Sequence, residues 1–182
     1  MMSAQDPRNK FKTSDYDQQE QELPGLQSKM TPQPDCGETS YKGHERLKGY
    51  KMLVTGGDSA IGRAAAIAYA KEGADVAINY LPSEEEDAQE VKQVIEDAGQ
   101  KGILIPGDLR DEQFNYDMVE TAYNELGGLD NVTLVAGHQQ YHDDIHGFNT
   151  EAFAETFETN VYPVFWTCLL YTSDAADDMQ CG

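Results

Sequence analysis

The feature that most constrains this chain is a glycine-rich turn between a short apolar run and an alanine-rich run. The segment Lys51–Ala66 reads KMLVTGGDSAIGRAAA, and Met52–Val54 is its apolar run. This order predicts a buried strand, a tight turn and a helix that begins near Ile61. Such a turn lets the backbone approach a phosphate group, and the helix N-terminus offers free N–H groups and a partial positive charge. The segment therefore predicts an α/β protein that holds a nucleotide pyrophosphate.

The rest of the chain continues this alternation of strand and helix. Further strands are predicted at 75–80, 103–106 and 132–136, and helices at 61–72, 82–98, 111–126 and 150 to about 170. Strands that alternate with crossover helices imply a parallel sheet with helices on both faces. The expected fold class is α/β, a Rossmann-type doubly wound parallel sheet of strand order 3-2-1-4. We expect it to be truncated after the fourth strand and the fourth helix.

Three segments are expected along the chain. Residues 1–47 are polar and contain four prolines, so this arm cannot bury enough apolar surface to order by itself. It is either disordered or lies along its own domain or a neighbouring subunit. Residues 48–167 form a partial Rossmann domain, and residues 168–182 are expected to be a foreign tail.

Composition restricts the partners. The chain has 13 Lys+Arg against 33 Asp+Glu, a net charge of −20, which argues against nucleic acid or an anionic membrane as a partner. No apolar run approaches the roughly 20 residues of a membrane span, and the N-terminus has no secretory h-region. The three cysteines form no metal or disulfide pattern. A cytoplasmic location is expected.

Several motifs in register give the chain a family resemblance. Thr55–Gly62 follows the pattern TGxxxGxG, except that Ala60 replaces the middle glycine. Asp108 follows the third predicted strand, Ala136-Gly137 ends the fourth, and Asn160 lies in the fourth predicted helix. In these motifs the chain resembles the short-chain dehydrogenase/reductase family. Over about residues 20–167 it is most similar to a bacterial subgroup with stress-associated and aldehyde-reductase-like members.

The resemblance implies an NAD(P)-dependent oxidoreductase that transfers a hydride between nicotinamide and a carbonyl or alcohol substrate. The complete protein would be a homo-oligomer, and Asn160 would belong to its active site. Asn79 and Tyr80 stand where the family reads the adenosine ribose, and they leave NAD or NADP open. The lack of Arg or Lys in the turn before Ala60 favours NAD. The residues expected to bind the cofactor are Gly56, Asp58, Ser59, Ile61, Gly62, Asn79, Tyr80, Asp108, Leu109, Ala136 and Gly137.

The resemblance also implies catalytic residues that the sequence does not contain. The family uses a Ser and a Tyr-x-x-x-Lys pair, in which the cation lowers the pKa of the phenol. None of the tyrosines here has a lysine four residues later. From about Cys168 the sequence departs from the family and resembles a translated sequencing adapter. We therefore expect a cofactor-binding N-terminal fragment that is catalytically incomplete, and the sequence does not name the substrate.

Two other functional classes remain as alternatives. A non-catalytic nucleotide-binding or interaction protein would need no Tyr-x-x-x-Lys pair, although Asn160 would then be idle. A metal-binding protein could use His138, His142 and His146, which are spaced four residues apart. Because a loop is expected after Gly137, helical spacing has no meaning there and no metal site is predicted. The acidic run at 84–87 is interpreted as an exposed helix start, and Cys36 as an inert thiol.

Overall fold

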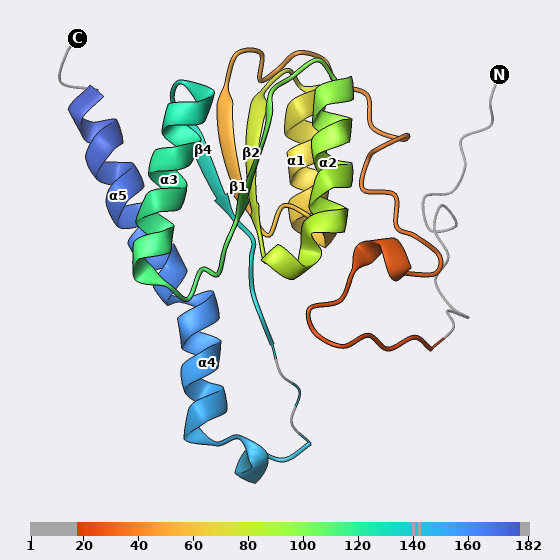
Figure 1. The fold of residues 1–182 in the computed structure, drawn as a ribbon, viewed down its shortest axis with the longest axis vertical. Helices are drawn as coiled ribbons and strands as arrows, with labels where there is room; N and C mark the ends of the chain where they lie inside the picture. The colour runs from red at the N-terminus through yellow and green to blue at the C-terminus, as the bar shows by residue number, and fades with distance from the viewer. Residues whose placement is uncertain (1–17, 140, 142, 179–182) are drawn as a thin grey trace.

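The computed structural model describes residues 18–139, 141 and 143–178, with side chains through Tyr171. Four parallel strands form one sheet in the order β3-β2-β1-β4, as the sequence predicts (Figure 1). The strands are β1 (Lys51–Thr55), β2 (Asp75–Tyr80), β3 (Gly102–Pro106) and β4 (Asn131–Leu134). The helices are α1 (Ala60–Lys71), α2 (Glu85–Asp97), α3 (Glu112–Leu126), α4 (Thr150–Asn160) and α5 (Tyr162–Asp178). Three short 3-10 helices are η2 (Gln27–Lys29), η3 (Pro82–Glu84) and η4 (Ile145–Gly147).

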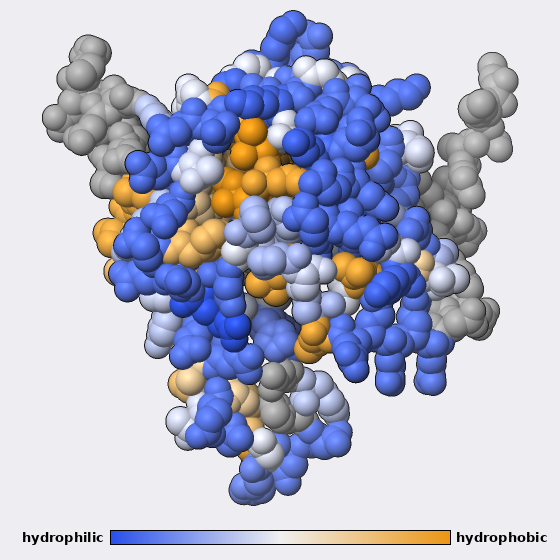
Figure 2. Space-filling view, in the orientation of Figure 1, coloured by the Kyte–Doolittle hydropathy of each residue, from blue (hydrophilic) through white to orange (hydrophobic). Residues whose placement is uncertain are grey.

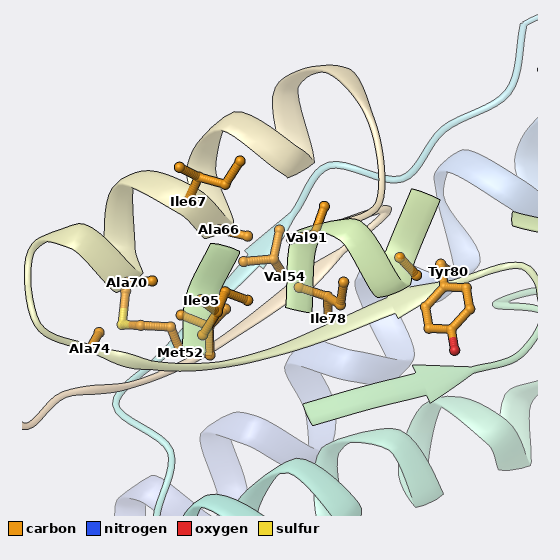
Figure 3. Packing of buried hydrophobic residues seen from close by; sticks show 12 residues of the cluster. Met52, Val54, Ala66, Ile67, Ala70, Ala74, Ile78, Tyr80, Val91 and Ile95 are labelled. Atoms are coloured by element: carbon orange, nitrogen blue, oxygen red, sulfur yellow. The ribbon is translucent and has the colours of Figure 1, made fainter. Parts of the chain in front are cut away.

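The sheet is buried on both faces, as expected for parallel strands joined by helices. Alternate residues of each strand point to opposite faces. Val54 and Ile78 pack beneath α1 and α2 with Ile67, Val91 and Ile95 (Figure 3). On the other face the core consists of Leu53, Ala77, Ile105, Leu109, Met118, Val119, Ala122 and Leu126, and α3 covers it. Figure 1 shows α1 and α2 on one side of the sheet, and α3 and α5 on the other.

Local sequence signals account for the ends of α3. The Asp111 side chain accepts a hydrogen bond from the N–H of Phe114, which caps the helix start. Gly127 follows the last turn with φ of 75°, a left-handed conformation in which a side chain would be strained. Both ends lie where the sequence pattern predicts them, because capping depends only on neighbouring residues.

The prediction of one fourth helix from Thr150 to about Leu170 is wrong. The structure has two helices, α4 and α5, which are separated at Val161. Pro163 lies in the first turn of α5, where its missing N–H costs nothing, whereas within a continuous helix its ring would clash with the preceding turn. Helix α5 then continues through position 168 to Asp178.

The described part of the arm, residues 18–47, lies against α1 and α2 (Figure 1). The Lys71 ammonium donates hydrogen bonds to the backbone carbonyls of Gly37 and Glu38, at 2.7 and 2.6 Å. The Glu72 carboxylate accepts the backbone N–H groups of His44 and Arg46, at 2.9 and 3.0 Å. Backbone polar groups of the arm are thus satisfied by side chains of its own domain. The sequence left open whether the arm is disordered or lies along a protein surface. In the structure, residues 18–47 lie along the surface of their own domain.

Among the described residues, none of the helices combines the length and the apolar character that a bilayer crossing requires. The visible face is mostly hydrophilic, as the charge of −20 predicts (Figure 2).

Candidate functional site

A cavity of about 590 Å³ lies at the carboxyl ends of the strands. Ligands of open parallel sheets bind in this crevice, where the strand order reverses. Here the reversal is between β1 and β4, since β1 lies between β2 and β4. Ten of the eleven predicted cofactor residues line the cavity: Gly56, Asp58, Ser59, Ile61, Gly62, Asn79, Asp108, Leu109, Ala136 and Gly137. Residues far apart in sequence therefore meet at one place.

The glycine turn forms the floor of the cavity because its backbone segments are packed together. A Cβ atom on Gly62 would lie 1.8 Å from the carbonyl oxygen of Gly56, so only glycine fits there. Gly56 has φ of 60°, which other residues rarely adopt. The N–H of Gly57 donates to the carbonyl of Asn79 at 3.0 Å and ties the turn to β2. The first turn of α1 is thereby held with its N-terminus toward the cavity.

Ala60, the departure from the family motif, has φ of 45°. The left-handed region costs an L-residue about 1–2 kcal/mol. The Ala60 N–H donates to Oε1 of Gln27 at 2.6 Å, so the arm contacts the turn at this strained position.

The two predicted residues at the end of β2 have mainly structural contacts. The Asn79 amide is buried and donates to the carbonyls of Ile105 and Gly107, both at 3.1 Å, which joins the ends of β2 and β3. Tyr80 is the predicted cofactor residue that does not line the cavity. Its ring belongs to the core cluster at the end of β2 (Figure 3), and its hydroxyl donates to Glu85 at 2.6 Å. Burial and this carboxylate raise the pKa of Tyr80.

At the end of β3, Asp108 is paired with Arg110. The guanidinium approaches the carboxylate to 2.6 Å and lowers the pKa of Asp108. Among the described residues that line the cavity, Arg110 is the single arginine or lysine. Sequence reasoning missed it, although its position two residues after Asp108 was a visible signal.

Asn160 does not line the cavity and instead fixes the loop that follows β4. Its Nδ2 donates to the carbonyl of His138 at 2.7 Å, and its Oδ1 accepts the N–H of His138 at 3.0 Å. A Cβ on Gly137 would lie 2.7 Å from this Oδ1, so the strand end and the amide are in close contact. On the other side of the strand end, Thr55 Oγ1 accepts the N–H groups of Val135 and Ala136. Asn160 therefore positions the backbone that borders the cavity.

The interpretation of the acidic run at 84–87 as an exposed helix start is wrong for Asp87. Asp87 is fully buried and accepts the backbone N–H groups of Gln27 and Ser28 from the arm. Glu84 is half-buried and lines the cavity, and burial together with the charge of Asp58 raises its pKa to about 7. The sequence could not reveal the burial of Asp87, because its hydrogen-bond partners are backbone N–H groups of the distant arm.

The sequence predicts no metal site at the three histidines that are spaced four residues apart, and the structure describes two of them. His138 lies in the loop after β4 and His146 in η4, while His142 lies outside the described residues. Within the ranges that the structure describes, no group of three or more His, Cys, Asp or Glu side chains could hold a metal ion. Burial raises the pKa of the Cys36 thiol, which agrees with an inert thiol.

The arm supplies lining residues that the sequence did not single out. Leu23, Pro24 and Gly25 border the cavity beside the turn of Asp58 and Ser59. The arm has no helical or strand periodicity, so no sequence pattern indicated this contact.

Comparison with known proteins agrees with this geometry. The family model of the short chain dehydrogenases matches residues 51–178. The chain is 57% identical over 166 residues to an uncharacterized oxidoreductase of Escherichia coli, YghA, covering 91% of this chain and 56% of the relative. It is 46% identical to general stress protein 39 of Bacillus subtilis, covering 87% and 54%. The chain therefore spans about half the length of the curated relatives it matches.

Solved structures show the same fold. A short chain dehydrogenase from Burkholderia cenocepacia in complex with NADP has a TM-score of 0.65 and 35% identity, covering 70% of this chain and 51% of that one. A short chain dehydrogenase from Mycobacterium paratuberculosis bound to NAD has a TM-score of 0.63 and 26% identity, covering 69% and 50%. Both nucleotides therefore occur among the structural relatives.

Proposed function

Since this chain belongs to the short-chain dehydrogenase family of oxidoreductases, we propose that its cavity binds NAD or NADP. The complete protein would transfer a hydride between nicotinamide and a carbonyl or alcohol substrate. The observation that carries the proposal is the convergence of ten predicted cofactor residues on one cavity at the carboxyl ends of the strands. Relatives solved with NADP and with NAD support the same choice of cofactor.

The residues around the cavity fit such a dinucleotide. In the glycine turn, Gly62 packs so closely against Gly56 that a Cβ atom on Gly62 would collide with the Gly56 backbone. The N-terminus of α1 beside this turn suits the pyrophosphate. Asp108 and Leu109 border the part of the cavity at β3, and Ala136-Gly137 borders the part at β4. When bound, the nicotinamide supplies the hydride donor or acceptor. The role of Asn160 is to hold the backbone at His138 beside Gly137, so it is a positioning residue for that end of the cavity.

We also propose that these 182 residues do not carry the acid–base pair. No tyrosine in the sequence is followed by lysine four residues later, and the pKa of Tyr80 is raised and not lowered. A proton donor poised near neutral pH is needed for carbonyl reduction. The chain alone should therefore bind nucleotide without oxidising or reducing a substrate.

Calorimetric titration of the chain with NAD+ and NADP+ tests the cofactor site. We expect one site per chain for at least one nucleotide. Gly62→Ala should abolish binding because its Cβ would collide with backbone. Gly147→Ala, where a Cβ meets nothing within 4 Å, is the matched control and should bind normally. No binding by the folded chain, or equal binding by Gly62→Ala, would refute the proposal.

A non-catalytic nucleotide-binding or interaction protein is the second candidate. The observation that favours it is the Asn160 amide, whose contacts are to the backbone of His138 and Thr156. An assay of the complete protein distinguishes the two candidates. An oxidoreductase would consume reduced nicotinamide in the presence of a panel of aldehydes, and a non-catalytic binding protein would not. Turnover that persists in the chain of 182 residues would contradict the proposed lack of an acid–base pair.

A further inference from the structure

The N-terminal arm contains a closed loop that borders the cavity. The Gln21 side chain pairs with the backbone of Leu26: its Oε1 accepts the Leu26 N–H at 2.9 Å, and its Nε2 donates to the Leu26 carbonyl at 3.0 Å. These two hydrogen bonds close the segment 21–26, which we call the arm loop. Leu23, Pro24 and Gly25 lie in the arm loop and line the cavity. The loop therefore presents a surface of defined shape to the cavity, although it is neither helix nor strand.

A buried carboxylate of α2 anchors the arm directly after this loop. Asp87 is fully buried, and its two oxygens accept the backbone N–H groups of Gln27 and Ser28, the latter at 3.1 Å. A buried carboxylate needs such donors, because an unpaired charge in the interior is costly. Asp87 itself is not among the residues that line the cavity. It therefore holds the arm loop in place without touching the space that the loop borders.

The side chain of Gln27 joins the same part of the arm to the glycine turn. Its Oε1 accepts the N–H of Ala60, the first residue of α1, at 2.6 Å. Its Nε2 donates to the Cys36 sulfur at 3.4 Å, and this thiol lies 3.7 Å from the Ala60 carbonyl. Gln27 is itself buried, so these contacts are shielded from water. The arm therefore bridges α2 and the turn, and the turn is part of the cavity wall.

Apolar side chains are exposed where the arm loop and α1 border the cavity. Leu23 of the arm loop is 72% exposed, Ile61 of α1 is 73% exposed, and both line the cavity. Apolar surface in a cavity is covered when a ligand binds, and its removal from water contributes to affinity. The arm loop thus offers contact area for a ligand in addition to the area offered by the strand ends and the glycine turn.

We infer that the arm loop is a wall of the nucleotide site, and that Asp87 is a positioning residue for nucleotide binding because it anchors this wall. The inference rests on the proposed function and adds to it a contact from outside the sheet and its helices. Docking of the arm and binding of the nucleotide are then linked. Each favours the other by the same factor, because coupling between two binding equilibria is reciprocal.

Calorimetric titration with the nucleotide that the parent chain binds more tightly tests the inference. Asp87→Asn should raise the dissociation constant about three- to tenfold, because the amide replaces one of the two acceptors with a donor and leaves the arm docked in fewer chains. Leu23→Ala should raise it by about the same factor through the lost apolar contact. Glu86→Gln, an exposed neighbour on α2 with the same change in charge, is the matched control and should bind like the parent. Loss of a negative charge favours an anionic nucleotide, so weaker binding by Asp87→Asn is not a charge effect.

Hydrogen exchange followed by NMR adds a readout that a merely structural role of Asp87 would not move. Saturating nucleotide should slow exchange of the Gln27 and Ser28 amides in the parent chain. The slowing factor should be at least as large as the loss of affinity in Asp87→Asn, as reciprocal coupling requires. The amides of His44 and Arg46, which α1 holds in the later part of the arm, are the control and should exchange equally fast with and without nucleotide.

The outcomes separate this inference from the function on which it rests. Parent-like affinity in Asp87→Asn or in Leu23→Ala, or no slowing at Gln27 and Ser28 in a chain that binds nucleotide, overturns the inference and leaves the nucleotide site intact. If Asp87→Asn does not fold, Leu23→Ala and the exchange rates of the parent chain decide. Binding of neither nucleotide by a parent chain with a native circular dichroism spectrum overturns the proposed function, and the inference with it.

Discussion

Among the described non-glycine residues, a positive φ occurs at two positions, Ala60 in the glycine turn and Glu45 in the arm. Ala60 has φ of 45° at the first position of α1, where the family motif has glycine. Its N–H is held by Gln27 of the arm, and its carbonyl lies 3.7 Å from the Cys36 sulfur. The arm therefore contacts the turn at a position where the backbone conformation is unfavourable for an L-residue.

Ala60→Gly should stabilise the folded chain by about 1 kcal/mol, because glycine removes the energetic penalty of the left-handed conformation. The higher conformational entropy of glycine in the unfolded chain offsets part of this gain. This corresponds to a rise in Tm of about 2–4 °C, measured by thermal melting. Nucleotide should also bind up to about tenfold more tightly, since a methyl group is removed beside the pyrophosphate. Ala64→Gly, inside the same helix, is the control and should lower Tm. A lower Tm in both variants would contradict the strain at residue 60.

Ionisation of the Glu84 carboxyl group should lower the free energy of unfolding as pH rises. Its folded pKa of about 7 lies above the unfolded value near 4.3, because burial and the charges of Asp58 and Asp87 disfavour its charged form. Between these two values the folded state holds more protons, so the free energy of unfolding decreases as the carboxyl ionises. Glu84→Gln should be more stable than the parent at pH 8, by at most about 3 kcal/mol, and equal to it at pH 4. Urea unfolding at both pH values measures this, and a variant that is less stable at pH 8 would contradict it.

At the scale of elements, sequence reasoning succeeded where local pattern decides. The second strand is found at Asp75–Tyr80 as predicted, and α3 starts and ends at its cap residues. It failed where distant segments decide: Asp87 is buried by the arm, and Tyr80 is directed into the core by α2. The break between α4 and α5 follows from a local signal, since Pro163 lacks the N–H that a continuous helix would need and its ring would clash with the preceding turn. For the site, the motifs located the cavity, but the contributions of Glu84, Arg110 and the arm depend on tertiary contacts.

The arm should be held to α1 by Glu72. Arg46 and Tyr41 donate to its carboxylate and hold the pKa of Glu72 well below its usual range. A carboxylate with a lowered folded pKa stabilises the folded state above its unfolded pKa, and this contribution is lost as pH falls below about 4.3. Glu72→Gln should therefore speed amide exchange at His44 and Arg46 about tenfold at neutral pH. Hydrogen exchange with mass spectrometry measures this, with Glu45→Gln, an exposed neighbour, as the control. Equal protection in Glu72→Gln would contradict the role of Glu72.

At the scale of the whole molecule, a strongly acidic surface is combined with an apolar helix face. The net charge is −20, whereas Phe157, Val161 and Phe165 of the α4–α5 region are 37%, 45% and 64% exposed. Apolar colour gathers on the side of the molecule formed by α5 (Figure 2). Exposed apolar patches favour association, and like charge opposes it. The balance between the two should depend on salt.

We expect the chain to self-associate through this face, and more strongly at high salt because screening weakens charge repulsion. Light scattering after size exclusion, at low and high ionic strength, measures the mass. Phe165→Glu should shift the chain toward the monomer at both ionic strengths. Tyr123→Glu, an exposed aromatic residue on α3, is the control and should keep the association. A monomer at all salt concentrations would contradict this expectation.

The central claim is that the cavity at the carboxyl ends of the strands is a dinucleotide site, and amide chemical shifts test it most directly. Titration of the 15N-labelled chain with NAD+ should move the signals of the turn at 56–62, of Asp108 and Leu109, and of Ala136 and Gly137 together, with one common dissociation constant. The signals of exposed α2 residues such as Gln89 should stay in place. Shifts confined to α4 and α5, or no shifts at millimolar NAD+ and NADP+, would contradict the account.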